Sequence, residues 1–188
     1  MTLFSSLRAG PTVAALLFLS ACVGAPTSAP PPASHHPRPA PAAPLPKDWR
    51  DWPVAKGGWT YWTISGSSIA AFGEAGRPAQ LVFRCELAGH RLFIARAIAP
   101  RTAPINRQLT VHTSFGDLQW PIVDTPLLAH GQPGLSATYA VSIRAASDRG
   151  LDQIAFSRGR FAIEAPDAAP LSVPGWAEVS RVIEDCRG

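Results

Sequence analysis

The stretch LVFRCELAGHRLFIARAI, residues 81 to 98, decides the fold. Apolar side chains recur in it with a period of two, which is typical of β-strands that have one buried face. Ala88 and Gly89 separate its two halves and allow the chain to turn. The stretch therefore predicts a β-hairpin. The side chains that share its buried face are Leu81, Phe83, Cys85 and Leu87 in the first half, and Leu92, Ile94 and Ile98 in the second.

The same alternation continues on both sides of this hairpin and is punctuated by Gly, Pro and Asp turns. Within the stretch 138–146, Tyr139, Val141 and Ile143 form the clearest inward face. The further strands predicted in this way are 59–64, 69–73, 109–114, 118–123, 138–146 and 160–165.

Two segments have helical spacing. Asp148 is placed to cap a short helix through Leu151 and Ile154, although the same residues also fit a strand continued into Phe156. The second segment follows Gly175 and carries one apolar stripe opposite charged residues, which is typical of an amphipathic helix. The stripe consists of Trp176, Val179, Ile183 and Cys186. The predicted fold is mainly β, an antiparallel sandwich or barrel-like sheet with a C-terminal amphipathic helix packed on it.

Residues 1–21 have the order of a secretory signal peptide: a region ending in Arg8, an apolar run over 11–19, and the small Ala21. The run is about half of the roughly 20 residues that span a bilayer, so a permanent transmembrane helix is not expected. Ordinary signal peptidase prefers a small residue three places before the cut, where this chain has Leu19.

The residues Leu19, Ser20, Ala21 and Cys22 resemble the bacterial lipobox. The resemblance implies a diacylglyceryl thioether on Cys22, cleavage before it and acylation of the freed amine, which together give a firm membrane anchor. Val23 stands where an Asp favours the inner membrane in enteric bacteria, so the outer membrane is favoured. The alternative is that Cys22 is incidental in a conventional signal peptide.

Residues 22–46 form a segment dominated by Pro and Ala, with nine prolines and no apolar period. We predict that it is a disordered, semi-rigid tether, in which His35 and His36 are solvated rather than metal ligands. Residues 47–188 are long enough for a single globular domain. The whole chain has a net charge of +4, and its arginines are scattered, so no nucleic-acid partner is expected.

Lipidation of Cys22 would leave Cys85 and Cys186 as a pair. Both lie on apolar faces, one on a predicted strand and the other on the C-terminal helix. In an oxidising compartment we expect a disulfide between them, with buried free thiols as the alternative. Because there is no C-x-x-C motif, neither a redox pair nor a zinc ribbon is indicated.

The sequence contains no convincing catalytic or metal site, and we expect no cofactor and no enzyme activity. His90, His112 and His130 lack the paired spacing of metal ligands and are expected at the surface or in turns. Asp117 and Asp124 are candidates for a glycosidase pair, with Trp120 as a sugar platform. Carboxylates in turns are the favoured interpretation.

A candidate ligand or partner surface contains aromatic and basic side chains. On one strand Trp59 and Tyr61 would face one way and Trp62 the other, and closing the core is the favoured role of these rings. Arg158 and Arg160 are suited to an anionic ligand, whereas local ion pairs are the favoured interpretation. The acidic partners considered are Asp148, Asp152 and Glu164.

Four stretches resemble a group of small, uncharacterised lipoproteins of alphaproteobacteria. They are GWTYW (58–62), LVFRCEL (81–87), LDQIAFSRGRFAIEA (151–165) and LSVPGWAEVSRVIEDCRG (171–188). The resemblance covers 49–188 and implies an exported domain with a bridge between Cys85 and Cys186. It implies no activity and no catalytic residues.

The function expected from the sequence is that of a lipid-anchored envelope protein that faces the periplasm and binds a protein partner without catalysis. The first alternative is a module that binds carbohydrate or peptidoglycan through the Trp-rich segment. The second alternative is an envelope hydrolase that uses Asp117 or a histidine.

Overall fold

The computed structural model describes residues 44–100, 107–123 and 137–188. Several predictions made above concern positions outside the described residues: the signal peptide, Cys22 and its lipidation, the tether as far as residue 43, His35 and His36, Asp124, and His130. The fold of the domain follows from the described residues alone.

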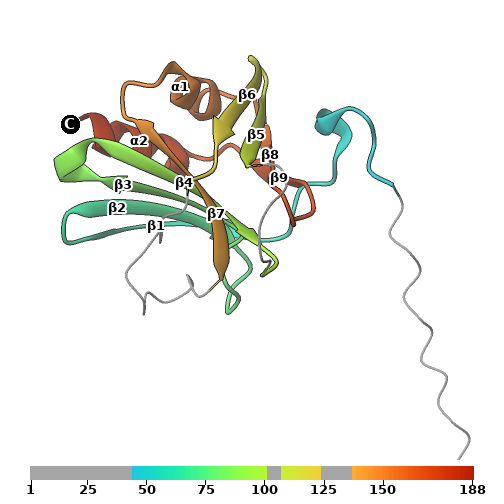
Figure 1. Ribbon diagram of the computed structural model, residues 1–188, viewed down its shortest axis with the longest axis horizontal. Coiled ribbons are helices and arrows are strands. Elements are labelled where there is room, and N and C mark those ends of the chain that lie inside the picture. The colour runs from blue at the N-terminus through green and yellow to red at the C-terminus, as the bar shows by residue number, and fades with distance from the viewer. Residues whose placement is uncertain (1–43, 101–106, 124–136) are drawn as a thin grey trace, which may run out of the picture. The chain divides into compact units, whose positions relative to one another are not determined.

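Two antiparallel sheets form a sandwich and not a closed barrel, which confirms the predicted fold class (Figure 1). The larger sheet has the order β1-β2-β3-β4-β7 and the smaller one the order β6-β5-β8-β9. The strands of the larger sheet are β1 (Gly58–Ile64), β2 (Ser67–Gly73), β3 (Leu81–Glu86), β4 (Arg91–Ile98) and β7 (Thr138–Ala145). Those of the smaller sheet are β5 (Gln108–Thr113), β6 (Gly116–Pro121), β8 (Arg160–Glu164) and β9 (Leu171–Pro174).

The hairpin predicted at 81–98 is confirmed as β3 and β4, which pair from Leu81 with Arg96 to Glu86 with Arg91. The 3-10 turn η2 (Leu87–Gly89) joins them, and His90 closes the turn with a positive φ of 48°. The six other predicted strands are also present. Only β9 was missed, because its four residues end at a proline and offer too short a run for a period of two to be recognised.

The main core lies between the two sheets and is closed by two helices, α1 (Arg149–Ala155) and α2 (Ala177–Arg187). Figure 1 shows both helices on the same side of the larger sheet as the smaller sheet. The buried face of α2 carries Val179, Val182, Ile183 and Cys186. Trp176 was predicted on this stripe, but it is the N-cap residue of α2 and is 49% exposed.

The opposite face of the larger sheet carries a second apolar cluster, which includes Ile69, Val82, Phe93 and Val141. The prediction that Tyr139, Val141 and Ile143 face the main core is therefore wrong, since all three belong to this second cluster. On β7 it is the small Ala140 that contributes to the main core. The larger sheet is apolar on both faces, so residue size alone did not identify the inner one.

A disulfide joins Cys85 of β3 to Cys186 of α2, with 5.4 Å between the two Cα atoms and 101 positions between them in the sequence. Both cysteines are completely buried in the main core. The bridge attaches the end of α2 to the centre of the larger sheet, as the positions of the two cysteines on apolar faces predicted. None of the helices in the described part of the chain has the length and hydropathy needed to cross a bilayer.

Candidate functional site

Trp59 belongs to the core and not to a ligand surface. Its side chain is 7% exposed, its indole N–H donates to the carbonyl oxygen of Pro174 at 2.8 Å, and its ring packs against Phe72, Phe83 and Phe161. The alternation expected along β1 is confirmed, because Trp59 and Tyr61 contact the main core while Trp62 contacts the second cluster. The five residues of the predicted partner surface are therefore not brought together.

Tyr61 lies beside α2. Its hydroxyl donates to Asp185 Oδ2 at 2.7 Å, and the guanidinium of Arg181 stands 4.1 Å from its ring centroid. Burial raises the pKa of Tyr61, and the hydrogen bond to Asp185 adds to the effect. Tyr61 is thus held in place by α2 while part of its side chain remains accessible.

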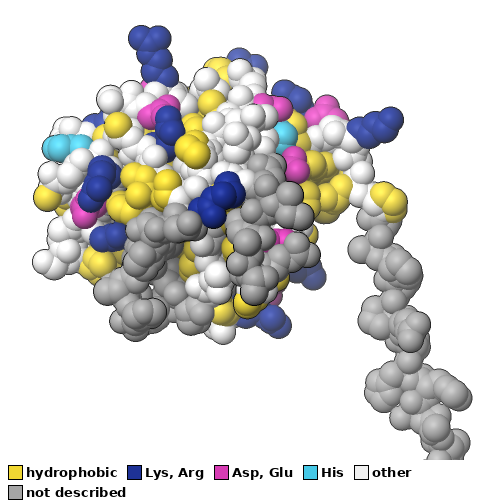
Figure 2. Space-filling view, viewed as in Figure 1, with side chains coloured by type: hydrophobic (Ala, Val, Ile, Leu, Met, Phe, Trp, Pro, Cys, Tyr) yellow, Lys and Arg dark blue, Asp and Glu magenta, His cyan; other side chains and the backbone are white. Residues whose placement is uncertain are grey.

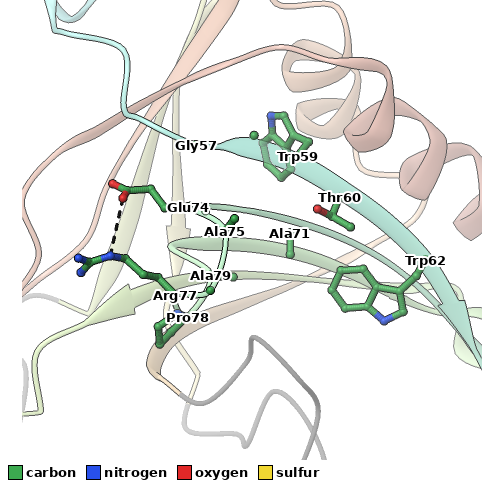
Figure 3. Close-up of a pocket in the computed structure, with 13 residues that line it drawn as sticks. Gly57, Trp59, Thr60, Trp62, Ala71, Glu74, Ala75, Arg77, Pro78 and Ala79 are labelled. Atoms are coloured by element: carbon green, nitrogen blue, oxygen red, sulfur yellow. Dashed lines mark ion pairs between the residues drawn. The ribbon is translucent and has the colours of Figure 1, made fainter.

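Trp62 borders an open groove of about 760 Å³ on the other face of the sheet (Figure 3). The floor includes Ala71, and the far wall is the connection between β2 and β3, at 74–79. Glu74 and Arg77 form an exposed ion pair on this wall, with 3.7 Å between Oε2 and Nε. Among the described residues, small and apolar side chains make up most of the lining of this groove.

Arg158 and Arg160 do not form the local ion pairs that were expected. The three acidic residues considered as their partners pair with other side chains. Asp148 pairs with Arg144, Asp152 with Arg187, and Glu164 with His112. Arg160 instead donates to the carbonyl oxygens of Arg50 and Trp52, both at 3.2 Å. Arg158 is exposed, and its guanidinium has no partner within the described ranges.

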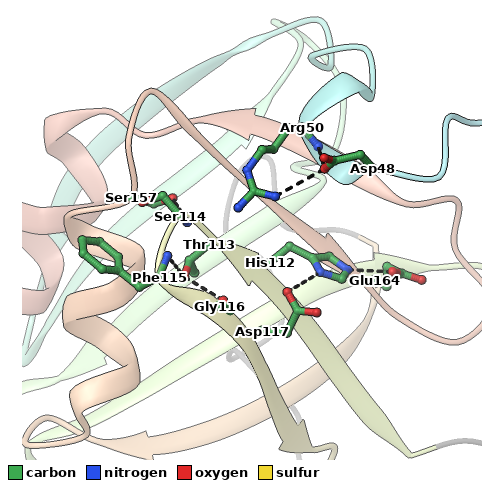
Figure 4. A network of polar contacts seen from close by, with 10 residues as sticks. All are labelled: Asp48, Arg50, His112, Thr113, Ser114, Phe115, Gly116, Asp117, Ser157 and Glu164. Atoms are coloured by element: carbon green, nitrogen blue, oxygen red, sulfur yellow. Dashed lines mark hydrogen bonds and ion pairs between the residues drawn. The ribbon is translucent and has the colours of Figure 1, made fainter.

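His112 of β5 is the centre of a polar cluster (Figure 4). Its Nδ1 lies 2.8 Å from Asp117 Oδ1, and its Nε2 lies 2.7 Å from Glu164 Oε1. The rings of Trp49 and Trp52 cover it, with centroids at 6.1 and 5.6 Å. The prediction of a surface or turn histidine is therefore wrong for His112, whose side chain is only 12% exposed.

The chemistry of this cluster is that of a clamp. Both ring nitrogens of His112 face carboxylate oxygens, and neither is directed at a hydroxyl or thiol among the described residues. A general base needs the nucleophile within hydrogen-bond reach. The cluster binds the 3-10 segment η1 (Trp49–Asp51) to the smaller sheet through Trp49 and through Trp52, which is the C-cap residue of η1.

The remaining residues weighed for catalysis are placed apart from any ligand surface. Trp120 is 4% exposed and lies under the guanidinium of Arg144 at 5.3 Å, so it offers no platform for a sugar. Asp117 faces His112 across the β5–β6 hairpin instead of lying in a turn. In the part of the chain that is described, no group of three or more histidine, cysteine or carboxylate side chains is arranged to hold a metal ion.

Three large aromatic residues are exposed at one end of the domain. The exposed fractions are 57% for Phe115, 68% for Phe156 and 49% for Trp176. They come from three different connections, and hydrogen bonds join the backbone next to each of them at the turn that begins at Ser157. Ser114 N donates to Ser157 Oγ at 3.0 Å, and Gly175 N donates to the carbonyl oxygen of Gly159 at 3.1 Å.

Arg158 belongs to the same turn, since its backbone N–H donates to Ser114 Oγ at 3.1 Å. Figure 4 shows Phe115 beside Ser157 at the tip of the β5–β6 hairpin. We call the set Phe115, Phe156, Arg158 and Trp176 the Phe/Trp surface. Of the four residues in the Phe/Trp surface, the sequence predicted only Arg158 for a partner surface, because single aromatic residues in turns leave no periodic signal.

Charges of both signs are mixed with apolar side chains on the face that Figure 2 shows. No basic stripe of the kind that tracks a nucleic-acid backbone is visible on this face. The chain matches no protein-family model, no curated protein and no solved structure. Its function is therefore argued from the geometry of its own surfaces.

Proposed function

We propose that this protein is a lipoprotein of the bacterial cell envelope that binds a protein partner through the Phe/Trp surface and performs no catalysis. The observation that carries the proposal is the exposure of Phe115, Phe156 and Trp176 around one turn. Large exposed aromatic side chains that gather on a folded domain are typical of interaction sites.

The composition of the Phe/Trp surface suits a protein interface. Aromatic residues and arginine are enriched in the energetically dominant parts of such interfaces. Burying one Phe side chain completely contributes about 1.5–3 kcal/mol, so Phe115 and Phe156 together offer a substantial gain. The hydrogen bonds of Ser157 hold the turn in place before binding, which reduces the entropy that is lost on association.

The anchor is argued from the sequence. Lipidation at Cys22 and the Pro-rich tether would hold the domain facing the periplasm, on the outer membrane in preference to the inner one. Two or more acyl chains anchor a protein stably, whereas one chain binds only marginally. A tether of 22–46 would reach up to roughly 70 Å if it extends as polyproline helices do.

The binding role is tested by photo-crosslinking of the full-length protein in intact cells. A photoreactive residue at position 156 should give an adduct with one envelope protein. The matched control is position 149, because Arg149 is exposed at the opposite end of the same helix. Identical adducts at both positions, or no adduct at positions 115, 156 and 176, would contradict the proposed surface.

The anchor has its own test. Cys22→Ser should move the protein from the membrane pellet to the soluble fraction and abolish labelling by a palmitate analogue. A Cys22→Ser protein that stays in the pellet would contradict the lipid anchor but not the Phe/Trp surface.

The rival role as a hydrolase is tested at the clamp. His112→Ala and Asp117→Asn should still complement a deletion strain if the protein acts by binding. Asp117 is only two positions from Phe115, so lost complementation favours catalysis only if both variants remain folded and anchored and still give the adduct at position 156.

Glycan binding is the second candidate, and the observation that favours it is the accessible edge of Trp62 at the open groove. Aromatic rings bind sugars by stacking, but a specific sugar site also needs several converging polar groups. Titration calorimetry with purified peptidoglycan fragments separates the candidates. Heat that disappears in Trp62→Ala and persists in Trp176→Ala would favour the glycan.

A further inference from the structure

Strand β1 is an open edge of the larger sheet. The backbone bonds from Leu87 N to Gly66 O and from Gln80 N to Phe72 O show which residues of β2 face β3. Backbone groups of a strand alternate in direction, so the intervening residues of β2 face β1. Their partners are Gly58, Thr60, Trp62 and Ile64. The N–H and C=O groups of Trp59, Tyr61 and Thr63 consequently point away from the sheet.

The outward N–H and C=O groups of Trp59, Tyr61 and Thr63 recur at every second residue, as they do along the edge of a regular strand. None of them takes part in a backbone hydrogen bond to another segment of the described chain. Thr63 is exposed and Tyr61 is half-buried, so the edge is reachable from solvent at these two residues, whereas Trp59 is buried. Unpaired edge groups in this arrangement are what an added strand requires.

A groove lies on each side of this edge. The outer groove is the one that Trp62 borders, and its lining is largely apolar. The inner groove has about 580 Å³ and lies between Tyr61 and α2. A strand paired with β1 would direct successive side chains alternately into the two grooves, because side chains alternate between the faces of a sheet.

The two grooves differ in charge. Glu178 and Glu184 line the inner groove, and Asp185 lies against the Tyr61 hydroxyl. Among the described residues that line the inner groove, Arg181 carries the one guanidinium, and it is stacked on Tyr61. The inner groove therefore suits a basic side chain, whereas the outer groove suits an apolar one.

We propose that the open edge of β1 binds an extended segment of a partner protein by strand addition, and that basic side chains alternate with apolar ones in this segment. The proposal rests on the proposed function in assuming a protein partner, but it uses the backbone edge of β1, which the Trp176 ring adjoins at Gly58. The chain's own tether is a poor occupant, since its nine prolines cannot donate backbone hydrogen bonds.

The test measures binding of fluorescent peptides to the full-length protein in detergent. The probe is a short peptide of alternating lysine and leucine, and the comparison peptide replaces lysine by glutamate. We expect the lysine peptide to bind at least about tenfold more tightly, because one well-placed charge-assisted contact is worth about that factor. The double variant Glu178→Lys and Glu184→Lys should reverse this preference.

Backbone pairing is tested at position 63. Thr63→Pro removes an outward N–H and leaves the bonds to β2 intact, and Thr63→Ala is the matched control because it keeps the N–H. We expect binding to fall several-fold, up to about tenfold, in Thr63→Pro only. If Thr63→Pro does not fold, a lysine peptide N-methylated at alternate residues makes the same test on the unchanged protein.

Three outcomes would overturn the proposal: equal binding of the lysine and glutamate peptides, full binding of the N-methylated peptide, and an edge-to-edge dimer that Thr63→Pro dissolves. The last outcome would make a second copy the occupant. Crosslinking at position 156 decides the proposed function separately, since Phe156 lies on the Phe/Trp surface and not on β1. If the peptides do not bind but the crosslinked adduct at position 156 still forms, only the proposal of strand addition is contradicted.

Discussion

Tyr61 and Tyr139 are the two tyrosines of the chain, and both are held with the phenol protonated. The Tyr139 hydroxyl donates to the carbonyl oxygen of Ala79 at 2.9 Å, and burial raises the pKa of Tyr139 to about 12. Burial also raises the pKa of Tyr61, with a further contribution from Asp185. Neither phenol is in the environment of a free tyrosine.

An alkaline titration should therefore show less phenolate absorbance near pH 10, the ordinary pKa, than two free tyrosines would give, while the protein is folded. In the unfolded chain both groups lose the proton near pH 10, whereas folded Tyr139 keeps it to about pH 12. Stability falls as the pH rises through this window, since the unfolded state binds fewer protons. Tyr139→Phe should reduce the fall. A folded protein that develops full phenolate absorbance at pH 10 would contradict these positions.

The His112 clamp shows what residue-level prediction could not reach. Asp117 is five positions from His112 and faces it only because β5 and β6 pair in one register. Glu164 is 52 positions away and arrives through the pairing of β5 with β8. The residue types were visible in the sequence, but the contact depends on a long-range strand pairing that spacing does not encode.

Helix α1 packs closely against β6. Asp148 caps it as predicted, since its side chain accepts from Gly150 N at 2.7 Å. A Cβ at Gly150 would lie 2.8 Å from Trp120 Cζ2 and 3.2 Å from Leu118 Cδ1. The helix therefore approaches β6 closely because residue 150 has no side chain.

Gly150→Ala should lower the free energy of unfolding by about 1–2 kcal/mol, as overpacking outweighs the gain in helix propensity. Chemical denaturation followed by tryptophan fluorescence measures the change. The control is Gln153→Ala, a half-buried position on the same helix where Ala should be neutral or slightly stabilising. A Gly150→Ala protein as stable as this control would refute the close approach of α1 to β6.

At the level of elements, strands with alternating apolar residues between strong turn residues were predictable. The exceptions have physical reasons. β9 is too short to show a period, and β7 was assigned the wrong inner face because both faces of the larger sheet are apolar. Trp176 continued the apolar stripe of α2 in sequence, but the helix begins at Ala177, one residue after it.

For the whole domain, the disulfide between Cys85 and Cys186 is the main covalent constraint. The double variant Cys85→Ala and Cys186→Ala should lower the free energy of unfolding by about 2–5 kcal/mol, because the closed loop is long. Denaturation with and without reductant measures this loss. Cys22→Ser is the control, since it leaves the Cys85–Cys186 pair intact. Equal free energies of unfolding for the unchanged protein, the Cys22→Ser variant and the double variant would show that the bridge contributes nothing.

The arrangement of the binding surfaces was beyond sequence reasoning at this scale. The two sheets and the C-terminal helix followed from patterns along the chain. The Phe/Trp surface depends on three turns that are distant in sequence and meet at Ser157, and the grooves beside β1 depend on where α2 settles. Such surfaces are properties of the packed molecule, and no local pattern describes them.

The separation of the two bridged cysteines in the sequence also sets the time for which Cys85 is present without its partner Cys186. When the chain is exported as it is synthesised, at roughly 5–20 residues per second, the thiol of Cys85 reaches the oxidising compartment about 5–20 s before that of Cys186, which follows 101 positions later. During this interval the one other cysteine of the chain is Cys22. The proposed thioether on Cys22 would remove the only other thiol of the chain that could form a disulfide with Cys85. Early lipid attachment would therefore also favour the correct bridge between Cys85 and Cys186.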